Sequence, residues 1–193
     1  MRRALVALLV LAAVGGLGFA YVDHTQPGWW VRLRYPLYYR DSIVGYGRQY
    51  HLDPALIAAV VYEESRFKAN SRSSAGAIGL MQLLPSTARG IAAHTGGTTF
   101  DPRHDLYDAD LNIRYGSWYL AHLRQKYAGR RDSGDLALAA YNAGQANVDR
   151  WISETPAGRP VRVRFAATRD YVADVHHLVS LYRKAYGDQL GSG

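Results

Sequence analysis

Two adjacent glutamates, Glu63 and Glu64, stand near the end of an apolar segment. Successive helical residues are rotated by about 100°, which places Ile57, Val60 and Val61 on one face. Glu64 falls near the centre of that face, whereas Glu63 lies at its solvent-accessible margin. Burial disfavours a charged carboxylate and should raise the pKa of Glu64. A carboxyl group that keeps its proton near neutral pH can act as a general acid on a poor alkoxide leaving group.

The same glutamate also has a purely structural interpretation. Arg66 and Lys68 follow shortly after the helix, and either could form an ion pair with Glu64 at the helix end. Periodicity alone does not separate this ion pair from a buried catalytic acid.

The loop after this helix, "SRSSAGAIGLMQ", has a composition suited to sugar binding. Gly76 and Gly79 would let the backbone approach a ligand closely. Ser73 and Gln82 supply hydrogen-bonding side chains, and Met81 supplies an adaptable apolar one. A plain turn has a similar composition, so the loop alone does not identify a site.

Helices are expected to position these residues. Pro54 after Asp53 is typical of a helix start, and Leu111, Tyr115, Tyr119 and Leu123 recur every four residues on a later helix. Residues 161–165, "VRVRF", alternate as a short extended piece would. The pattern predicts an all-α domain with helices at 39–50, 54–67, 85 to just before Gly96-Gly97, 108–127, 135–142, 147–152 and 168–186.

Composition limits the class of protein. The 193 residues are 48% hydrophobic and 20% charged, which favours one folded domain. The net charge of +7 suits an anionic partner such as nucleic acid, lipid headgroups or an acidic cell wall. With no cysteine, the chain has no disulfide and no thiolate metal site.

The N-terminus predicts export and anchoring. Arg2 and Arg3 precede an uncharged, mostly apolar run from Ala4 to Val22, close to the length of a membrane-spanning helix. Gly18-Phe19-Ala20 would also suit signal cleavage, so residues 1–22 are a signal-anchor or a signal peptide, with the uncleaved anchor favoured. Residues 23–36 form a juxtamembrane tether, residues 37–187 the functional domain and residues 188–193 a C-terminal tail. Five aromatic residues follow in and after the tether, and they are equally well interpreted as a membrane-interface anchor or as ordinary packing residues: Trp29, Trp30, Tyr35, Tyr38 and Tyr39.

Several motifs, taken in order, resemble the lytic transglycosylase family with its goose-type-lysozyme-like fold. The resemblance covers residues 42–186. It is carried by Glu64-Ser65, "GLMQ" at 79–82, "PSTA" at 85–88, "NIRYGSWYL" at 112–120, "AYNAG" at 140–144 and "TRDYV" at 168–172.

The resemblance implies cleavage of the β-1,4 bond between N-acetylmuramic acid and N-acetylglucosamine in peptidoglycan, without water. It implies that Glu64 acts as acid and then as base, producing a 1,6-anhydro sugar. Tyr141 would lie beside it, with its hydroxyl hydrogen-bonded to the carboxyl group or the substrate, although an ordinary core tyrosine is the simpler alternative. Neither a metal nor another cofactor is expected. The expected partners are glycan strands and, through the N-terminal helix, the membrane. The enzyme should be a monomer in the cell envelope outside the cytoplasm, or secreted if residues 1–22 are cleaved.

The resemblance also suggests substrate contacts. Ser73, Met81 and Gln82 are expected to contact N-acetyl and hydroxyl groups, and Gly79 to admit the ligand. Ser65 would orient the loop or bind substrate. Asn142 would fix its turn or touch sugar. Many relatives carry a Glu before the closing Thr-Arg pair, where this chain has Ala167, and this departure puts substrate positioning in question.

Four alternatives were compared with this hypothesis. A goose-type lysozyme would need a further aspartate, for which Asp101, Asp105 and Asp108 are candidates, although loop and N-cap roles are simpler. A non-catalytic wall-binding module would not need Glu64 with Tyr141. No HExxH spacing supports a metal enzyme, and no recognised motif supports nucleic-acid binding.

Overall fold

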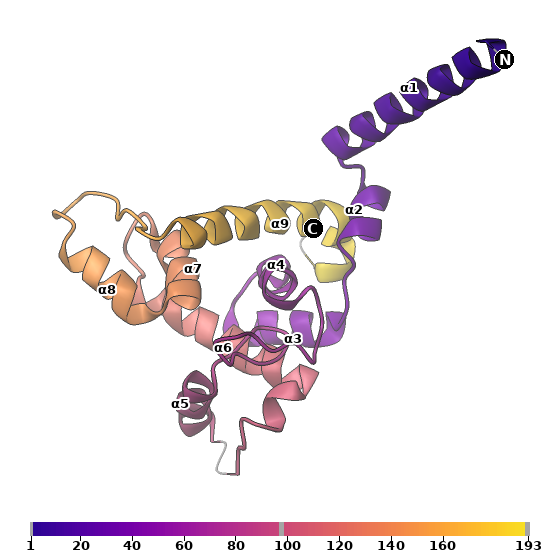
Figure 1. Ribbon diagram of the computed structural model, residues 1–193. Coiled ribbons are helices and arrows are strands. Elements are labelled where there is room, and N and C mark those ends of the chain that lie inside the picture. Colours follow the sequence, from indigo (N-terminus) through magenta and orange to yellow (C-terminus); the bar gives the residue numbers. More distant parts are fainter. Residues whose placement is uncertain (1, 97–98, 192–193) are drawn as a thin grey trace. The chain divides into compact units, whose positions relative to one another are not determined.

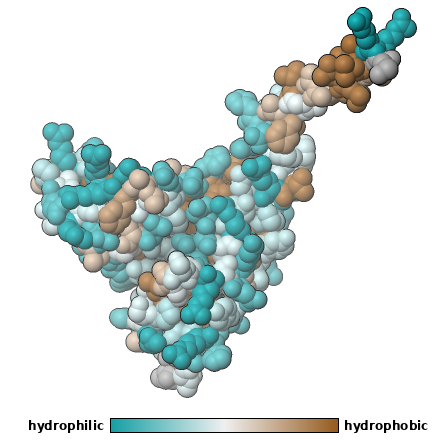
Figure 2. All heavy atoms as spheres, in the orientation of Figure 1, coloured by the Kyte–Doolittle hydropathy of each residue, from teal (hydrophilic) through white to brown (hydrophobic). Residues whose placement is uncertain are grey.

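The computed structural model describes residues 2–96 and 99–191, and the chain forms two compact units, Met1–Pro36 and Leu37–Gly193. The first unit contains helix α1 (Arg2–Thr25) and helix α2 (Gly28–Arg34). The expected tether at 23–36 therefore contains a helix of its own. Helix α1 is long and apolar enough, by its length and composition, to cross a membrane. Figure 2 shows its surface as mostly hydrophobic with a hydrophilic end.

In the second unit, every regular element among the described residues is a helix, and extended backbone pairs only in two isolated bridges within 72–83. The elements are α3 (Arg40–Tyr50), α4 (Pro54–Ser65), α5 (Pro85–Thr95), the 3-10 helix η1 (Asp105–Tyr107), α6 (Ala109–Lys126), α7 (Ser133–Ala143), α8 (Gln145–Ser153) and α9 (Ala166–Leu190). The long helix α9 packs along α4, and α6 packs against α3 and α7 (Figure 1). This confirms the expected all-α class.

Local signals explain how α4 begins and ends. The side chain of Asp53 accepts a hydrogen bond from the Ala55 N–H at 2.8 Å and caps the helix before Pro54. The helix ends at Ser65, two residues earlier than expected, because Arg66 and Phe67 adopt left-handed backbone conformations with φ of 52° and 60°. The Arg66 N–H still bonds to the Tyr62 carbonyl, so the left-handed turn closes the helix. The chain therefore leaves the helix direction one residue after Glu64.

Other boundaries differ modestly from the sequence-based expectation. Helix α9 continues through Leu190, so part of the expected tail at 188–193 is helical. Residues 160–165 form neither helix nor strand, but Val161 and Val163 are partly buried while Arg162 and Arg164 are exposed, as an extended segment would arrange them. Gly97 of the expected helix stop and residues 192–193 of the expected tail lie outside the described residues.

Candidate active site

Glu64 occupies the last turn of α4, four residues after the fully buried Val60 and three after the fully buried Val61. Its carboxyl group is therefore carried by the core-facing side of the helix, as the periodicity predicts. Burial raises its pKa to about 7, an effect strengthened by the nearby charge of Glu63 and partly opposed by the hydroxyl of Tyr171. At neutral pH Glu64 is thus poised between its protonated and ionised forms, as a proton-transferring group requires.

The neighbouring Glu63 forms the helix-end ion pair that had been an alternative role for Glu64. A guanidinium nitrogen of Arg66 lies 3.5 Å from a Glu63 carboxylate oxygen, and that guanidinium also covers the Tyr62 ring at 4.3 Å. The Glu63 side chain is 18% exposed. Burial raises its pKa, Arg66 lowers it and Asp174 raises it again. Of the two adjacent carboxyl groups, Glu63 is therefore the ion-paired one, whereas burial dominates the pKa of Glu64.

Tyr171 is a site residue that the sequence placed only within a matching motif. It lies on α9 and is 7% exposed, with its hydroxyl close enough to Glu64 to favour the ionised carboxylate. Within the described residues the hydroxyl forms no hydrogen bond of standard geometry, although it lies near the Glu64 carboxyl group. Burial and the charge of Glu64 raise the pKa of Tyr171 well above its ordinary value. Tyr171 therefore remains a neutral donor facing the carboxyl group.

Tyr141 lies on α7, and its hydroxyl was expected to form a hydrogen bond with Glu64 or with substrate. In the structure the hydroxyl donates to the Met81 carbonyl at 2.8 Å. A hydroxyl has one proton to donate, so Tyr141 could bond to the carboxyl group only as an acceptor. Burial, followed by the charge of Glu64, raises the pKa of Tyr141 well above its ordinary value. Tyr141 thus neighbours Glu64 electrostatically while it holds the 79–82 loop in place.

Asn112 of α6 holds the 79–82 loop in place through its side chain, which is 1% exposed. Its amide group donates to the carbonyls of Ile78 at 3.0 Å and Leu106 at 2.8 Å, and its oxygen accepts the Met81 N–H at 2.8 Å. Gly79 has φ of +85°, and a Cβ atom there would lie 2.1 Å from the Asn112 amide nitrogen. Gly79 is thus required by backbone conformation and packing, in addition to any role in ligand approach.

The Met81 side chain is fully buried. It packs on Gly116 of α6, where an added Cβ would lie 2.3 Å from the Met81 sulfur. In this arrangement Met81 presents its backbone to the site, and its thioether fills the core beneath the loop.

The remaining predicted residues fall into two groups. Ser73 and Gln82 are partly exposed on the loop: the Ser73 hydroxyl accepts the Ala77 N–H at 3.0 Å, and the Gln82 amide donates to the Ser71 and Gly79 carbonyls at 3.2 and 2.8 Å. Ser65 is buried, and its hydroxyl donates back to the Val61 carbonyl. Asn142 accepts a hydrogen bond from Thr168 at 2.8 Å and so ties α7 to the start of α9.

The carboxylates of the acidic loop before α6 have structural roles. Asp108 accepts the Leu111 N–H at 2.7 Å and caps α6. Asp101 accepts the Arg103 N–H, and Asp105 accepts the Asp101 N–H, at 3.0 and 2.8 Å. These bonds agree with the loop and N-cap interpretation of these aspartates.

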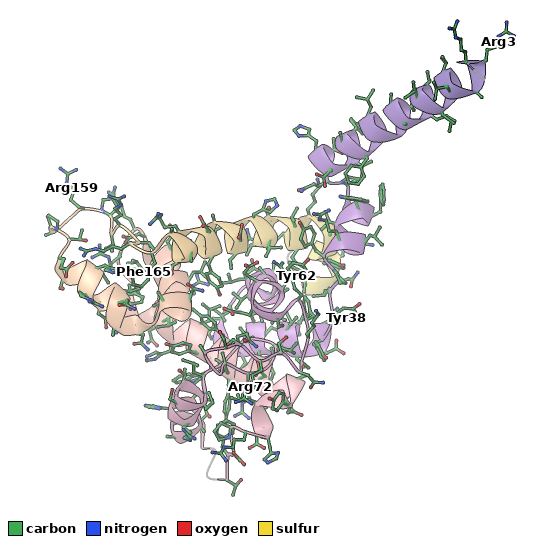
Figure 3. The ribbon with its side chains drawn as sticks, viewed as in Figure 1. Arg3, Tyr38, Tyr62, Arg72, Arg159 and Phe165 are labelled. Carbon is green, nitrogen blue, oxygen red and sulfur yellow. The ribbon has the colours of Figure 1, made fainter. Side chains whose placement is uncertain are left out.

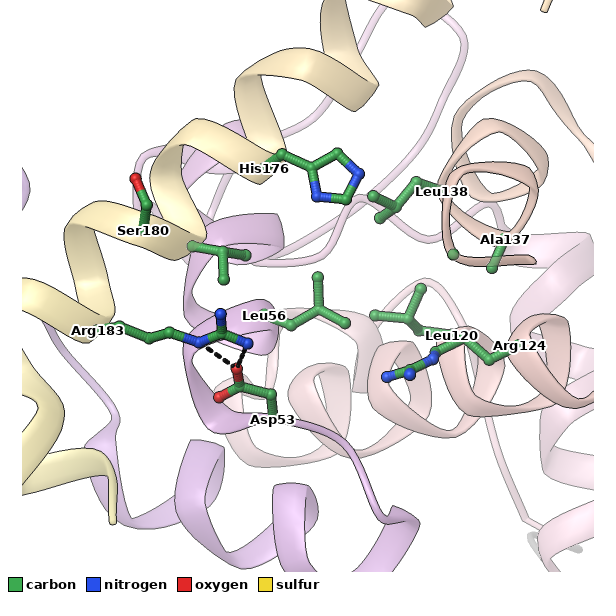
Figure 4. A pocket seen from close by; sticks show the side chains of 11 residues that line it. Asp53, Leu56, Leu120, Arg124, Ala137, Leu138, His176, Ser180 and Arg183 are labelled. Carbon is green, nitrogen blue, oxygen red and sulfur yellow. Dashed lines mark hydrogen bonds and ion pairs between the residues drawn. The ribbon is translucent and has the colours of Figure 1, made fainter. Parts of the chain in front are cut away.

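A separate hollow of about 300 Å³ lies where the start of α4 meets α6, α7 and α9 (Figure 4). Arg183 donates two hydrogen bonds to one carboxylate oxygen of Asp53 at its edge, at 2.8 and 2.5 Å. Leu56 in its floor precedes Glu64 by eight residues, about 12 Å along the helix axis. This hollow is therefore distinct from the surroundings of Glu64.

Replacement of Tyr171 by Phe is expected to move the pH dependence of any reaction that needs protonated Glu64. The hydroxyl lowers the pKa of Glu64, so its removal should raise that pKa further and shift the alkaline limb of kcat/KM to higher pH by about half a unit to one unit. Tyr141→Phe is the matched comparison. It removes the bond to Met81 and should lower stability by about 1 kcal/mol or more with a smaller shift of the limb. Equal pH profiles for wild type and Tyr171→Phe would contradict this role.

Comparison with known proteins identifies the family. The model of the family "Transglycosylase SLT domain" matches residues 41–160. The soluble lytic murein transglycosylase of Escherichia coli is 31% identical over 162 residues, which is 81% of this chain and 24% of that protein. The membrane-bound lytic murein transglycosylase C of Actinobacillus succinogenes is 37% identical over 114 residues, 56% of this chain and 32% of that protein.

Solved structures agree. The lytic transglycosylase Slt of Pseudomonas aeruginosa, crystallised as an inactive Glu-to-Gln mutant, superimposes with a TM-score of 0.69 at 30% identity over 84% of this chain and 26% of its own. The 70-kDa soluble lytic transglycosylase in complex with bulgecin A gives a TM-score of 0.74 at 29% identity, over 83% of this chain and 26% of its own. The chain therefore spans about a quarter of the length of these structures. The fold is the all-α lysozyme-like one, and the chain belongs to the transglycosylase SLT domain family.

Proposed function

We propose that this protein is a peptidoglycan lytic transglycosylase that uses Glu64 as its single acid and base. The observation that carries the proposal is the position of Glu64 on the core-facing side of the last turn of α4, where burial raises its pKa to about 7. The names of the murein-cleaving relatives supply the substrate class. The inactive Glu-to-Gln mutant of the Pseudomonas enzyme further supports an essential glutamate in this fold.

In the first step, protonated Glu64 donates its proton to the oxygen of the β-1,4 bond between N-acetylmuramic acid and N-acetylglucosamine. The C1–O bond breaks, N-acetylglucosamine leaves as a neutral alcohol, and positive charge develops at C1 of the muramic acid residue. Glu64 is now ionised within a desolvated site. Tyr171, which favours the ionised carboxylate, stabilises Glu64 at this stage.

In the second step, ionised Glu64 accepts the proton of the C6 hydroxyl of the same muramic acid residue. The C6 oxygen bonds to C1 and closes the 1,6-anhydro ring, so no water enters the product. Glu64 regains its proton and the cycle is complete. One carboxyl group suffices because the substrate supplies the nucleophile, whereas most glycoside hydrolases need a second carboxylate. The structural roles of Asp101, Asp105 and Asp108 are consistent with this single-acid proposal.

The 73–82 loop, which Asn112 holds in place, would position the substrate. Ser73 and Gln82 are partly exposed there and carry oxygen atoms able to bind N-acetyl and hydroxyl groups. Ser65 and Asn142 are engaged with Val61 and Thr168, which favours positioning roles for both. Helix α1 would anchor the enzyme in the membrane with residues 37–187 outside the cytoplasm, in keeping with its apolar length and the membrane-bound relatives.

Product analysis tests the reaction type. The full-length protein in detergent micelles is incubated with purified peptidoglycan, and the released muropeptides are weighed by mass spectrometry. We expect 1,6-anhydro ends, lighter by one water than hydrolysed ends. Reducing ends would identify a lysozyme instead. Binding without any released product would identify a wall-binding module.

A further inference from the structure

A basic segment leads directly into α9. Residues 155–169 contain four arginines and no acidic residue. Within this stretch Arg162 is exposed between the partly buried Val161 and Val163, so the alternation directs basic side chains to solvent. Helix α9 itself begins with no acidic residue in its first turn, and Asp170 is the first carboxylate that follows.

The backbone of this segment is held in place by its surroundings. Asp132 accepts the Val161 N–H at 2.8 Å, and Arg169 donates to the carbonyls of Val163 and Arg164 at 3.0 and 2.9 Å. The Phe165 ring meets Trp151 edge-on at 5.1 Å. The segment therefore presents its side chains from a fixed frame, which reduces the ordering cost of binding.

Three guanidinium groups, two on this segment and one beside it, have no carboxylate of their own. We call Arg131, Arg159 and Arg162 the arginine strip. All three are exposed, and within the described residues their side chains form neither an ion pair nor a hydrogen bond. Arg131 and Arg159 line one surface hollow, and Figure 3 shows Arg159 directed outward from the loop before α9. Their neighbours Arg130 and Arg164 are instead paired with Asp132 and Glu154.

Arg162, at one end of the strip, is connected to the surroundings of Glu64 by a short stretch of chain. Ala167 precedes Tyr171 by one helical turn on the same side of α9, and Tyr171 faces Glu64. Arg162 stands four residues before the helix. It is therefore within about 20 Å of Tyr171, at about 1.5 Å per helical residue and about 3.3 Å per extended residue. A substrate bound at Glu64 that carries a side branch could reach the strip.

We propose that the arginine strip binds the carboxylates of the peptide attached to muramic acid, so that the enzyme favours glycan whose peptides keep their free carboxylates. This inference rests on the proposed function. In peptidoglycan the free carboxylates lie on the short peptides, because the lactyl carboxyl of a peptide-bearing muramic acid is engaged in the amide bond to its peptide. Guanidinium groups match carboxylates with paired N–H donors. Because the strip is exposed, its contribution should weaken as ionic strength rises.

Cleavage of two substrates by the full-length protein in detergent tests the proposal. One substrate is intact peptidoglycan, and the other is the same material with its peptide carboxylates converted to neutral amides, which keeps the peptides in place. At low salt, Arg159→Gln/Arg162→Gln should lower kcat/KM on intact peptidoglycan about fivefold and leave the rate on the amidated material unchanged. The control Arg48→Gln/Arg103→Gln removes the same charge from exposed positions on α3 and on the loop before η1, and should affect neither substrate.

Sedimentation with insoluble substrate separates this proposal from the catalytic one. In a Glu64→Gln background, binding to intact peptidoglycan should still fall about fivefold when the strip is altered, even if the wild type released no anhydro product. Equal losses on both substrates, or equal losses in strip and control variants, would overturn the proposal. So would a strip effect confined to proteoliposomes that contain phosphatidylglycerol, because that result would assign the strip to lipid headgroups.

Discussion

Glu64→Gln should reduce the release of anhydro muropeptides by about 10³-fold or more, with peptidoglycan binding retained. The substitution keeps the shape of the side chain but removes the proton that must pass to the glycosidic oxygen and return from the C6 hydroxyl. General acid–base catalysis typically contributes about 10² to 10⁴ in rate, and here one group performs both transfers. Initial rates measured by mass spectrometry, together with sedimentation binding, check this prediction.

Glu63→Gln is the matched control. It changes the adjacent carboxyl group, which pairs with Arg66, and should leave the rate within a few-fold of wild type. A large loss in Glu63→Gln with an active Glu64→Gln would reverse the assignment of the catalytic acid.

The Glu64→Gln protein should also be more stable than wild type at alkaline pH. The pKa of Glu64 is about 7 in the folded chain against 4.5 for an unperturbed carboxyl group. Below pH 4.5 the carboxyl is protonated in both states, and the two proteins should unfold alike. As pH rises towards 7 the wild type loses about 3 kcal/mol, because the unfolded chain releases this proton first. Denaturant unfolding at pH 4 and pH 8 measures the difference and shows that the inactive variant is folded.

The sequence predicted the part of the site that lies within one helix. A period of about 100° per residue and a run of apolar residues were enough to distinguish the faces of Glu63 and Glu64, since both signals are local. The boundaries of α4 were nearly right for the same reason. Its early end was missed, because Arg66 and Phe67 adopt left-handed conformations that neither residue type favours.

Contacts between distant helices were harder to predict. Tyr171 faces Glu64 only because α9 packs along α4 in a particular rotation, and no local pattern fixes that rotation. Tyr141 was expected at the carboxyl group, but its proton goes to the Met81 carbonyl, which the fold brings within 2.8 Å. Motif membership thus selected the candidate residues, whereas their hydrogen-bond partners depended on tertiary packing.

Asn112→Ala should lower the free energy of unfolding by about 3–5 kcal/mol. The change would leave two buried carbonyls, of Ile78 and Leu106, and one buried N–H, of Met81, without their partner. Each unsatisfied buried group costs about 1–3 kcal/mol, and water entering the new space would recover part of that loss. Thermal and denaturant unfolding measure the effect, with Asn70→Ala at an exposed position as the control.

The same substitution should lower kcat more than tenfold at temperatures where the protein remains folded. The amide of Asn112 fixes the Met81 backbone, whose carbonyl in turn receives the Tyr141 hydroxyl, so the loop beside Glu64 would lose its support. Asn112→Asp sharpens the argument, because it keeps the acceptor for the Met81 N–H while directing an oxygen at two carbonyl oxygens. An ionised carboxylate is repelled there, so Asn112→Asp should lose stability as pH rises, whereas the loss in Asn112→Ala should not depend on pH. If Asn112→Ala unfolded like the wild type and kept its rate, the loop would have to be held by other contacts.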